Sequence, residues 1–249
     1  MNIAVCVCQV PDTASVIGYV DGAIDRSRVN EVMNPYDEYA LEEAVLVKER
    51  FEGSIVTVFS LVPDSAKEVL RKALTMGADR VVRVSCSEEV SDPFQTAQML
   101  SRAISSFYPT GLPDLVFCGK QSTDFQSAQV PSMLAEILGM ASVSGITSLR
   151  ASGDFFRVER EVEGGIEYID VTCPALLSAE KGLNEPRNTS IRAVMEARKK
   201  SIDILELNLH DEPYVVMTGL QPIERKKTCC IVPDEHELVR ILSHECNLF

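Results

Sequence analysis

The chain has 249 residues, of which 45% are hydrophobic and 24% are charged, and its formal net charge is −13. A chain of this length can bury a substantial core without disulfides or metals. The negative charge argues against nucleic-acid binding, and no apolar run reaches the roughly 18 residues of a membrane span. The first residues, MNIAVCVCQVPDT, lack the basic region and cleavage site of a signal peptide, so we expect a first strand and a cytoplasmic protein.

Apolar runs rich in β-branched residues alternate with amphipathic segments over the first 140 residues. The runs cover residues 2–10, 54–62, 80–84 and 114–118. Strand and helix in alternation predict an α/β fold with a mostly parallel sheet and helices on both faces. Three helices begin with a capping signal: Asn34 followed by Pro35, a capping box of Ser65 and Glu68, and Asp92 followed by Pro93.

The segment 119–139, GKQSTDFQSAQVPSMLAEILG, opens like a phosphate-binding turn but contains neither G-x-G-x-x-G nor G-K-[ST]. Its second half predicts a helix that ends at Gly139 and buries Val130, Met133, Leu134, Ile137 and Leu138. The first half is then a polar loop between the carboxyl end of a strand and a helix N-terminus, where open α/β sheets bind ligands. An ordinary polar connection with an Asp cap is the alternative.

The pattern changes after residue 140. Short alternating runs at residues 142–149, 155–161 and 166–172 predict an antiparallel addition. Residues 201–249 contain only short apolar runs and scattered prolines, which cannot form a core. We therefore expect an α/β nucleotide-binding domain over residues 1–200 and a C-terminal arm over residues 201–249 that packs on another subunit.

Catalytic and metal-binding patterns find little support. The three histidines all lie beyond residue 209, which gives no basis for a Ser/His/Asp arrangement. The eight cysteines have no C-x-x-C pair and no regular spacing, unlike a zinc or disulfide framework. We assign neither a catalytic residue nor a metal ligand.

Five motifs in order resemble the β subunit of electron transfer flavoproteins: VCVCQVPDT, MNPYDEYALEEAVLVKE, RKALTMGADR, GKQSTDFQSAQ and SAEKGLNEPRNTSIRAVMEARKK. The resemblance runs essentially from end to end. It implies an α/β fold of the adenine-nucleotide α-hydrolase type, Rossmann-like in outline. It also implies an obligate heterodimer with an α subunit. In that heterodimer FAD would be held mainly by the α subunit, and this chain would bind AMP as a structural nucleotide.

The resemblance also implies site residues by position. Nucleotide contacts would come from Cys6, Asn34, Pro35, Tyr36, Asp37, Leu61, Gly119, Lys120, Gln121, Ser122, Thr123, Asp124, Phe125, Gln126, Ser127, Ala128, Gln129 and Val130. The backbone N–H groups of residues 126–129 would bind the phosphate. Residues 186–195 resemble the family's recognition loop for acyl-CoA dehydrogenases, with docking contacts from Pro186, Arg187, Ile191 and Met195. Without the resemblance, Ile191 is an ordinary core residue.

Two alternatives to an AMP-binding electron carrier follow from the residues. Cys8 stands where the family usually has a basic residue, and Phe125, Gln126 and Ser127 replace a stretch that is often acidic. Some members hold a second FAD in this site and split the electrons of NADH between two acceptors. An ATP-cleaving enzyme would need an S-G-G-x-D-S loop where this chain has CQVPDTASV, which disfavours that function.

Overall fold

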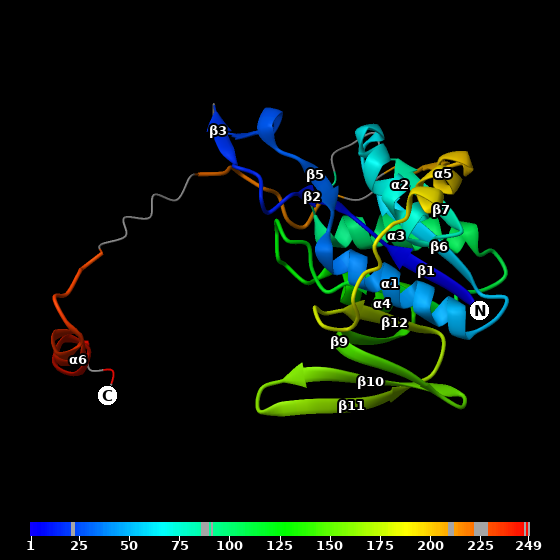
Figure 1. Ribbon diagram of the computed structural model, residues 1–249. Coiled ribbons are helices and arrows are strands. Elements are labelled where there is room, and N and C mark those ends of the chain that lie inside the picture. Colours follow the sequence, from blue (N-terminus) through cyan, green and yellow to red (C-terminus); the bar gives the residue numbers. More distant parts are fainter. Residues whose placement is uncertain are drawn as a thin grey trace. The chain divides into compact units, whose positions relative to one another are not determined.

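The computed structural model describes residues 1–20, 23–85, 90, 92–208, 212–221, 229–246 and 248 (Figure 1). The contacts between residues divide the chain into two compact units. The first comprises Met1–Gly18 and Asp25–Thr218, and the second comprises Tyr19–Ile24 and Gly219–Phe249.

The first unit is built on a nine-stranded sheet with the order β11-β10-β9-β12-β8-β1-β6-β7-β13. Its strands are β1 (Asn2–Cys6), β6 (Ile55–Leu61), β7 (Arg80–Ser85), β8 (Leu115–Gly119), β9 (Ala141–Ser152), β10 (Phe155–Val162), β11 (Gly165–Val171), β12 (Ala175–Ala179) and β13 (Asp203–Glu206). The seven strands from β9 to β13 along this order pair in parallel, while β9, β10 and β11 pair antiparallel. The predicted α/β fold with its antiparallel addition is confirmed.

The helices within the described residues are α1 (Pro35–Arg50), α2 (Lys67–Met76), α3 (Pro93–Phe107), α4 (Val130–Leu138), α5 (Ile191–Lys199) and α6 (Glu235–His244), with single 3-10 turns at Arg26–Arg28 and Asp64–Ala66. Two small two-stranded sheets complete the set: β2 (Gln9–Pro11) pairs antiparallel with β5 (Glu31–Met33), and β3 (Gly18–Val20) pairs with β4 (Ala23–Asp25). Helices α1 and α2 share one buried cluster with one face of the sheet, and α3 and α4 share the other. Both faces are therefore covered, as a parallel sheet requires.

Chain order identifies the switch point of the sheet. From β1 the chain proceeds outward through β6 and β7, and then returns to place β8 on the other side of β1. The crevice outside the carboxyl ends of β1 and β8 is where open α/β sheets bind ligands. The loops that follow β1 and β8 begin at this crevice, as the sequence predicts.

Several local predictions differ from the structure. The capping box is wrong, because α2 starts at Lys67 after a 3-10 turn and its N-cap position is Ala66, without a side-chain cap. Asp92 does cap α3 by accepting a hydrogen bond from the Phe94 N–H. Ile137 is 41% exposed rather than buried, and Ala135 takes its place in the core. Gly139 ends α4 in the left-handed conformation, as predicted.

The expected boundary at residue 200 lies between α5 and the last strand of the sheet, β13. Strand β13 pairs in parallel with β7, from Asp203 opposite Val82 to Glu206 opposite Ser85. The sheet therefore extends past residue 200. The C-terminal part of the second unit begins at Gly219. A sequence of only four residues, DILE, gave too short an apolar run to predict this edge strand.

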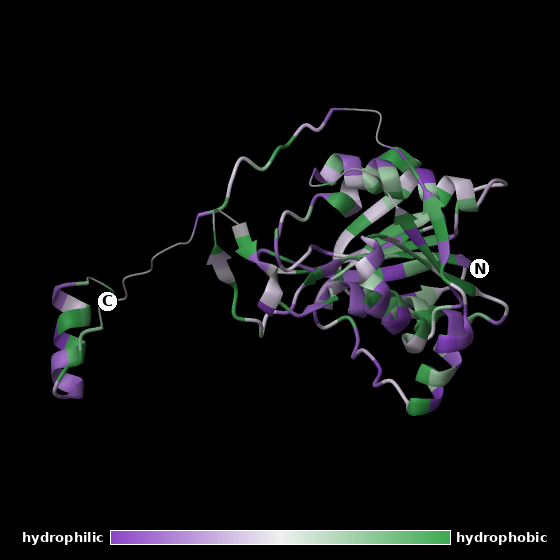
Figure 2. Ribbon diagram, turned by 90° about the horizontal axis from the view of Figure 1, so that it is seen from above, coloured by the Kyte–Doolittle hydropathy of each residue, from purple (hydrophilic) through white to green (hydrophobic). Residues whose placement is uncertain are grey.

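The second unit contains α6, which has no buried residue. Leu238 and Val239 on this helix are 44% and 53% exposed. Figure 2 shows hydrophobic and hydrophilic residues in alternating bands along it. Within the described ranges, no helix is long and apolar enough to cross a membrane.

Candidate functional site

A hollow of about 120 Å³ lies at the switch point, outside the carboxyl ends of β1 and β8. Its walls come from five places in the chain: the end of β1, the start of α1, the end of β6, one face of α3, and the segment from the end of β8 to the start of α4. The lining residues are Cys6, Val7, Cys8, Asn34, Asp37, Leu61, Thr96, Leu100, Cys118, Gly119, Gln121, Ser122, Ser127, Ala128, Gln129, Val130 and Pro131.

Asp37 ties three of these walls together. Its Oδ2 accepts a hydrogen bond from the Cys8 N–H at 2.7 Å, and its Oδ1 accepts one from the Gly119 N–H at 3.0 Å. Burial of this carboxyl raises its pKa from 3.8 to about 6, and the hydrogen bond from the Cys8 N–H partly opposes the shift. The carboxylate therefore joins the ends of β1 and β8 to the start of α1.

Gly119 is required by close approach rather than by its backbone angles. A Cβ at this position would lie 2.2 Å from the Asp37 Oδ1 and 2.7 Å from the Cβ of Tyr36. Real side chains do not approach this closely, so β8 can pack on the first turn of α1 only with glycine here.

Asn34 bridges to the β8–α4 loop instead of capping α1. Its Nδ2 donates to the Gln121 carbonyl at 2.9 Å, and its side chain caps no N–H of the helix. The residue is 1% exposed, and its Oδ1 has no hydrogen-bond partner within the part of the chain that the structure describes. A buried acceptor of this kind, on a residue that lines a hollow, is free to accept a hydrogen bond from water or from a bound molecule.

The loop between β8 and α4 has an unusual backbone. Gln126 and Ala128 adopt positive φ values of 55° and 53°, which non-glycine residues rarely do. The Gln126 N–H donates to the Ser122 carbonyl at 3.0 Å, so it is not available for a phosphate, contrary to the prediction for residues 126–129. Residues 127–129 precede the N-terminus of α4, whose dipole favours an anion.

Three thiols face the hollow. Cys118 and Cys6 lie opposite each other on β8 and β1. The pKa of Cys118 is raised well above its usual value, mainly by the hydrogen bond with Cys6 and also by burial. Burial likewise raises the pKa of Cys8. Thiols held neutral are poor nucleophiles and poor metal ligands. The described residues include no group of three or more His, Cys, Asp or Glu that could hold a metal ion.

The structure brings most, but not all, of the predicted site residues to this hollow. Pro35, Tyr36, Lys120, Thr123, Asp124, Phe125 and Gln126 are outside its lining. Phe125 is 63% exposed. The predicted contacts omitted Val7, Cys8, Cys118 and Pro131, which adjoin predicted residues, and also Thr96 and Leu100, which reach the hollow from α3. The Asp92-Pro93 start of that helix was a usable signal, because it places the first turns of α3 at the same sheet edge.

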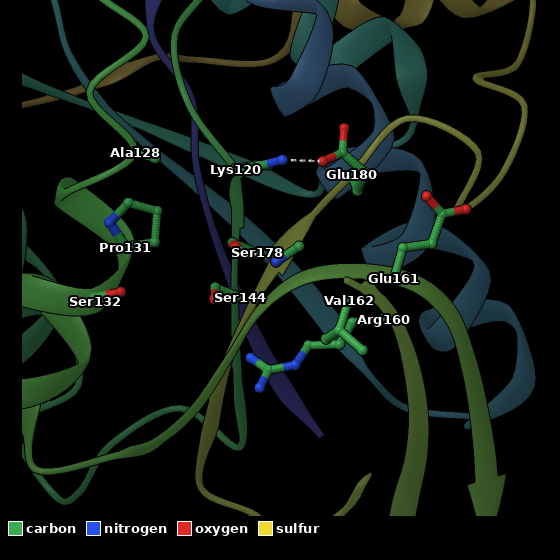
Figure 3. A pocket seen from close by; sticks show the side chains of 11 residues that line it. Lys120, Ala128, Pro131, Ser132, Ser144, Arg160, Glu161, Val162, Ser178 and Glu180 are labelled. Carbon is green, nitrogen blue, oxygen red and sulfur yellow. Dashed lines mark hydrogen bonds and ion pairs between the residues drawn. The ribbon is translucent and has the colours of Figure 1, made fainter. Parts of the chain in front are cut away.

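A larger hollow of about 420 Å³ adjoins the first one and shares Ala128 and Pro131 with it (Figure 3). It is lined by Lys120, Ala128, Pro131, Ser132, Ser144, Gly145, Arg160, Glu161, Val162, Ser178 and Glu180. Lys120 forms an ion pair with Glu180, which raises the pKa of the lysine. The predicted contact Lys120 therefore points to this second hollow rather than to the first.

The residues predicted for docking are divided by the structure. Ile191 and Met195, one turn apart on α5, are 83% and 60% exposed, so Ile191 is not a core residue. Arg187 is instead bound within the chain, to Glu42 and Glu49 of α1. Pro186 precedes it in a partly buried position.

Comparisons with known proteins agree on one family. Residues 21–210 match the model of the electron transfer flavoprotein domain. A protein of Thermoanaerobacterium thermosaccharolyticum named electron transfer flavoprotein subunit beta is 41% identical over 235 residues, covering 89% of this chain and 88% of the relative. The protein of the same name from Bacillus subtilis is 36% identical over 98% of this chain and 93% of its own length. One from Syntrophomonas wolfei is 36% identical over 88% of this chain.

Proposed function

Since the chain belongs to the electron transfer flavoprotein family, as a beta subunit, we propose that it binds AMP in the hollow between β1 and β8. Together with an α subunit, it would pass electrons from flavoprotein dehydrogenases, such as acyl-CoA dehydrogenases, to a downstream acceptor. FAD held mainly by the α subunit supplies the redox chemistry of such a complex. This chain catalyses no bond-making step itself; its residues bind, support and dock.

The buried Oδ1 of Asn34 carries the proposal for the nucleotide. It is an acceptor without a partner within the described residues, and the amino group of adenine and the hydroxyls of ribose are donors of the kind it lacks. Val7, Leu61 and Leu100 provide apolar walls suited to a base. The backbone of residues 127–129 and the start of α4 suit a phosphate. The residues present thus fit a nucleotide.

The test of this proposal is a count of nucleotides. The chain is co-purified with its α subunit, the complex is denatured, and released FAD and AMP are quantified per heterodimer. One FAD and one AMP are expected. In the Asn34→Leu variant the AMP content should fall about tenfold or more, as loss of a buried polar contact predicts. The matched control is Asn188→Leu, at an exposed position, which should keep full AMP content. Full AMP content in the Asn34→Leu complex would contradict the assignment.

The contact with the α subunit is proposed for the C-terminal part of the chain. Exposed apolar side chains gather in the second unit, where Leu220, Ile231, Leu238, Val239 and Leu248 are each at least 39% exposed. Exposed apolar side chains on a unit whose helix buries no residue suit a contact with another subunit. The isolated chain is therefore expected to be poorly soluble or unstable, and co-expression with the α subunit should rescue it. A monodisperse, cooperatively unfolding monomer in size-exclusion chromatography and calorimetry would count against this contact.

A second candidate function rests on the larger hollow. Because it adjoins the first and shares Ala128 and Pro131, a dinucleotide could extend from one into the other. The complex would then hold a second FAD in place of AMP and oxidise NADH, dividing its two electrons between two acceptors. Two FAD and no AMP per heterodimer would favour this function.

A substitution separates the two candidates. Ser144 is an exposed residue of β9 that lines only the larger hollow. Ser144→Phe should fill that hollow and leave the smaller one open. AMP content is then expected to be unchanged, whereas the content of a second FAD would fall.

A further inference from the structure

The helix that carries the predicted docking residues Ile191 and Met195, α5, buries very little of itself. Of its nine residues, Ala197 is the buried one, and Ile191 and Met195 project their apolar side chains outward. An isolated helix shorter than about 12 residues is marginal in water, and most helix stability in proteins comes from packing. Contacts other than core packing must therefore hold this helix in one orientation.

One such contact lies just before the helix. Nε and Nη2 of Arg187 donate to the carboxylate of Glu42 at 2.9 to 3.1 Å, and the Arg187 backbone N–H donates to the same group. Nη1 donates to Glu49 at 2.8 Å. The Glu42 side chain is 5% exposed, so removing this guanidinium would leave a buried carboxylate without its ion-pair partner. These hydrogen bonds hold the pKa of Arg187 above its usual range and lower the pKa of Glu49.

A second contact of the same segment reaches the same helix. The Nδ2 of Asn184 donates to the Tyr39 carbonyl and to the Glu43 carboxylate, both at 2.9 Å. Glu42 and Glu43 follow Tyr39 by three and four residues, so all three lie on one face of α1. The segment before α5 is thus fastened to a helix that is itself buried in the core.

A third contact fixes the other end of α5. Nη1 of Arg71, on α2, donates to the carbonyls of Ala197 and Lys200 at 2.7 and 2.6 Å. The Nζ of Lys200 donates to the Ala78 carbonyl at 2.8 Å. The last carbonyls of a helix have no partner within the helix, so a guanidinium there both satisfies them and fixes the axis.

We propose that Arg187 and Arg71 are positioning residues that hold Ile191 and Met195 in the orientation that a dehydrogenase partner binds. Arg187 itself does not touch the partner, because its donors are engaged by Glu42 and Glu49. This inference rests on the proposed electron transfer from a dehydrogenase, with docking at the residues predicted on α5, and adds how that docking surface is kept in place. Without either anchor, α5 occupies the binding orientation for only a fraction of the time, and the apparent affinity falls by that fraction.

The experiment uses the purified heterodimer and a short-chain acyl-CoA dehydrogenase with butyryl-CoA as electron donor. The dissociation constant of the two proteins is measured by biolayer interferometry, and kcat and KM for the heterodimer are measured from its reduction. Ile191→Ala should raise both the dissociation constant and KM. Arg187→Ala should raise them by about tenfold, with kcat unchanged, as a binding orientation populated one-tenth of the time predicts. Arg187→Lys should restore only part of the affinity, because lysine cannot bind Glu42 through two parallel hydrogen bonds.

A double-mutant cycle separates positioning from direct contact. If Arg187 acts through α5, adding Arg187→Ala to Ile191→Ala should cause little further loss, since the docking residue is already gone. Multiplicative losses would show that Arg187 contacts the partner by itself and would overturn the inference. The control Arg192→Ala also removes one positive charge, in this case from α5 itself. Arg192 pairs only with Glu196 in the described part of the chain, so this substitution should change affinity less than twofold.

The outcomes distinguish this inference from the docking proposal. If Ile191→Ala leaves affinity unchanged, the docking role of α5 is wrong. If Ile191→Ala weakens binding but Arg187→Ala does not, docking stands and the positioning role is wrong. Should Arg187→Ala fail to fold, Arg71→Met tests the other anchor, with an expected severalfold rise in KM at constant kcat. An unchanged KM in that variant would overturn the inference equally.

Discussion

Gly119→Ala tests whether the approach of β8 to α1 shapes the nucleotide site. The added Cβ would lie 2.2 Å from the Asp37 Oδ1 and 2.8 Å from the Tyr36 carbonyl carbon. These are atoms of a buried side chain and of the backbone, so neither can rotate away. The overlap is relieved only if the end of β8 moves away from α1, which lengthens the hydrogen bond from the Gly119 N–H to Asp37.

Two costs follow from this movement. Overpacking in a dense interior costs about 1–3 kcal/mol. Leaving the buried Asp37 carboxylate short of one donor costs about 1–3 kcal/mol more. The sum of about 2–6 kcal/mol is a large part of the stability of an ordinary domain, about 5–15 kcal/mol. For a chain of this size the melting temperature should fall on the order of 10 °C.

The assay is thermal unfolding of the heterodimer at fixed protein concentration, with AMP content measured on the same samples. The matched control is Gly165→Ala, where a Cβ would meet nothing within 4 Å and φ is not positive. This control should keep the melting temperature and the nucleotide. A Gly119→Ala complex that melts within about 2 °C of the wild type and retains its AMP would refute the reasoning.

Three further predictions concern the pH response of the site, its thiols and a helix cap. The pKa of Asp37 is about 6 in the folded chain, whereas its ordinary value, which applies to the unfolded chain, is 3.8. Because the folded chain holds this proton more tightly, the contribution to stability is fully present below pH 3.8 and is lost as pH rises through 6. This amounts to about 3 kcal/mol, and urea unfolding of Asp37→Asn should lack that part of the pH dependence. Cys6 and Cys118, buried and with the Cys118 pKa raised, should resist iodoacetamide until the protein is denatured, whereas exposed Cys230 reacts; rapid labelling of Cys118 in peptide mapping would contradict this. Asp92→Ala should lower stability by about 1–2 kcal/mol and speed proteolysis near Tyr214, because Asp92 both caps α3 and accepts a hydrogen bond from the Tyr214 N–H; unchanged proteolysis would show that this contact does not hold the segment.

The sequence by itself predicts the elements and the position of the site. Alternating apolar runs and capped amphipathic segments specify a parallel sheet, because their periodicity and end signals are local. The rule that ligands bind where parallel strands end then identifies the loops after β1 and β8. Asp92 and Gly139 act as the local signals predict, since their roles depend only on residues next to them in the chain.

Tertiary structure decides what the polar side chains of the site do. Asn34 looks like a helix cap, yet it bonds to Gln121, 87 residues away. Asp37 looks like an ordinary first-turn acid, yet it joins the ends of two strands. Arg187 looks like a surface contact for a partner, yet it binds Glu42, 145 residues earlier. Hydrogen bonds and ion pairs form between whichever groups the packed core brings within about 3 Å, and separation along the chain carries no information about that distance.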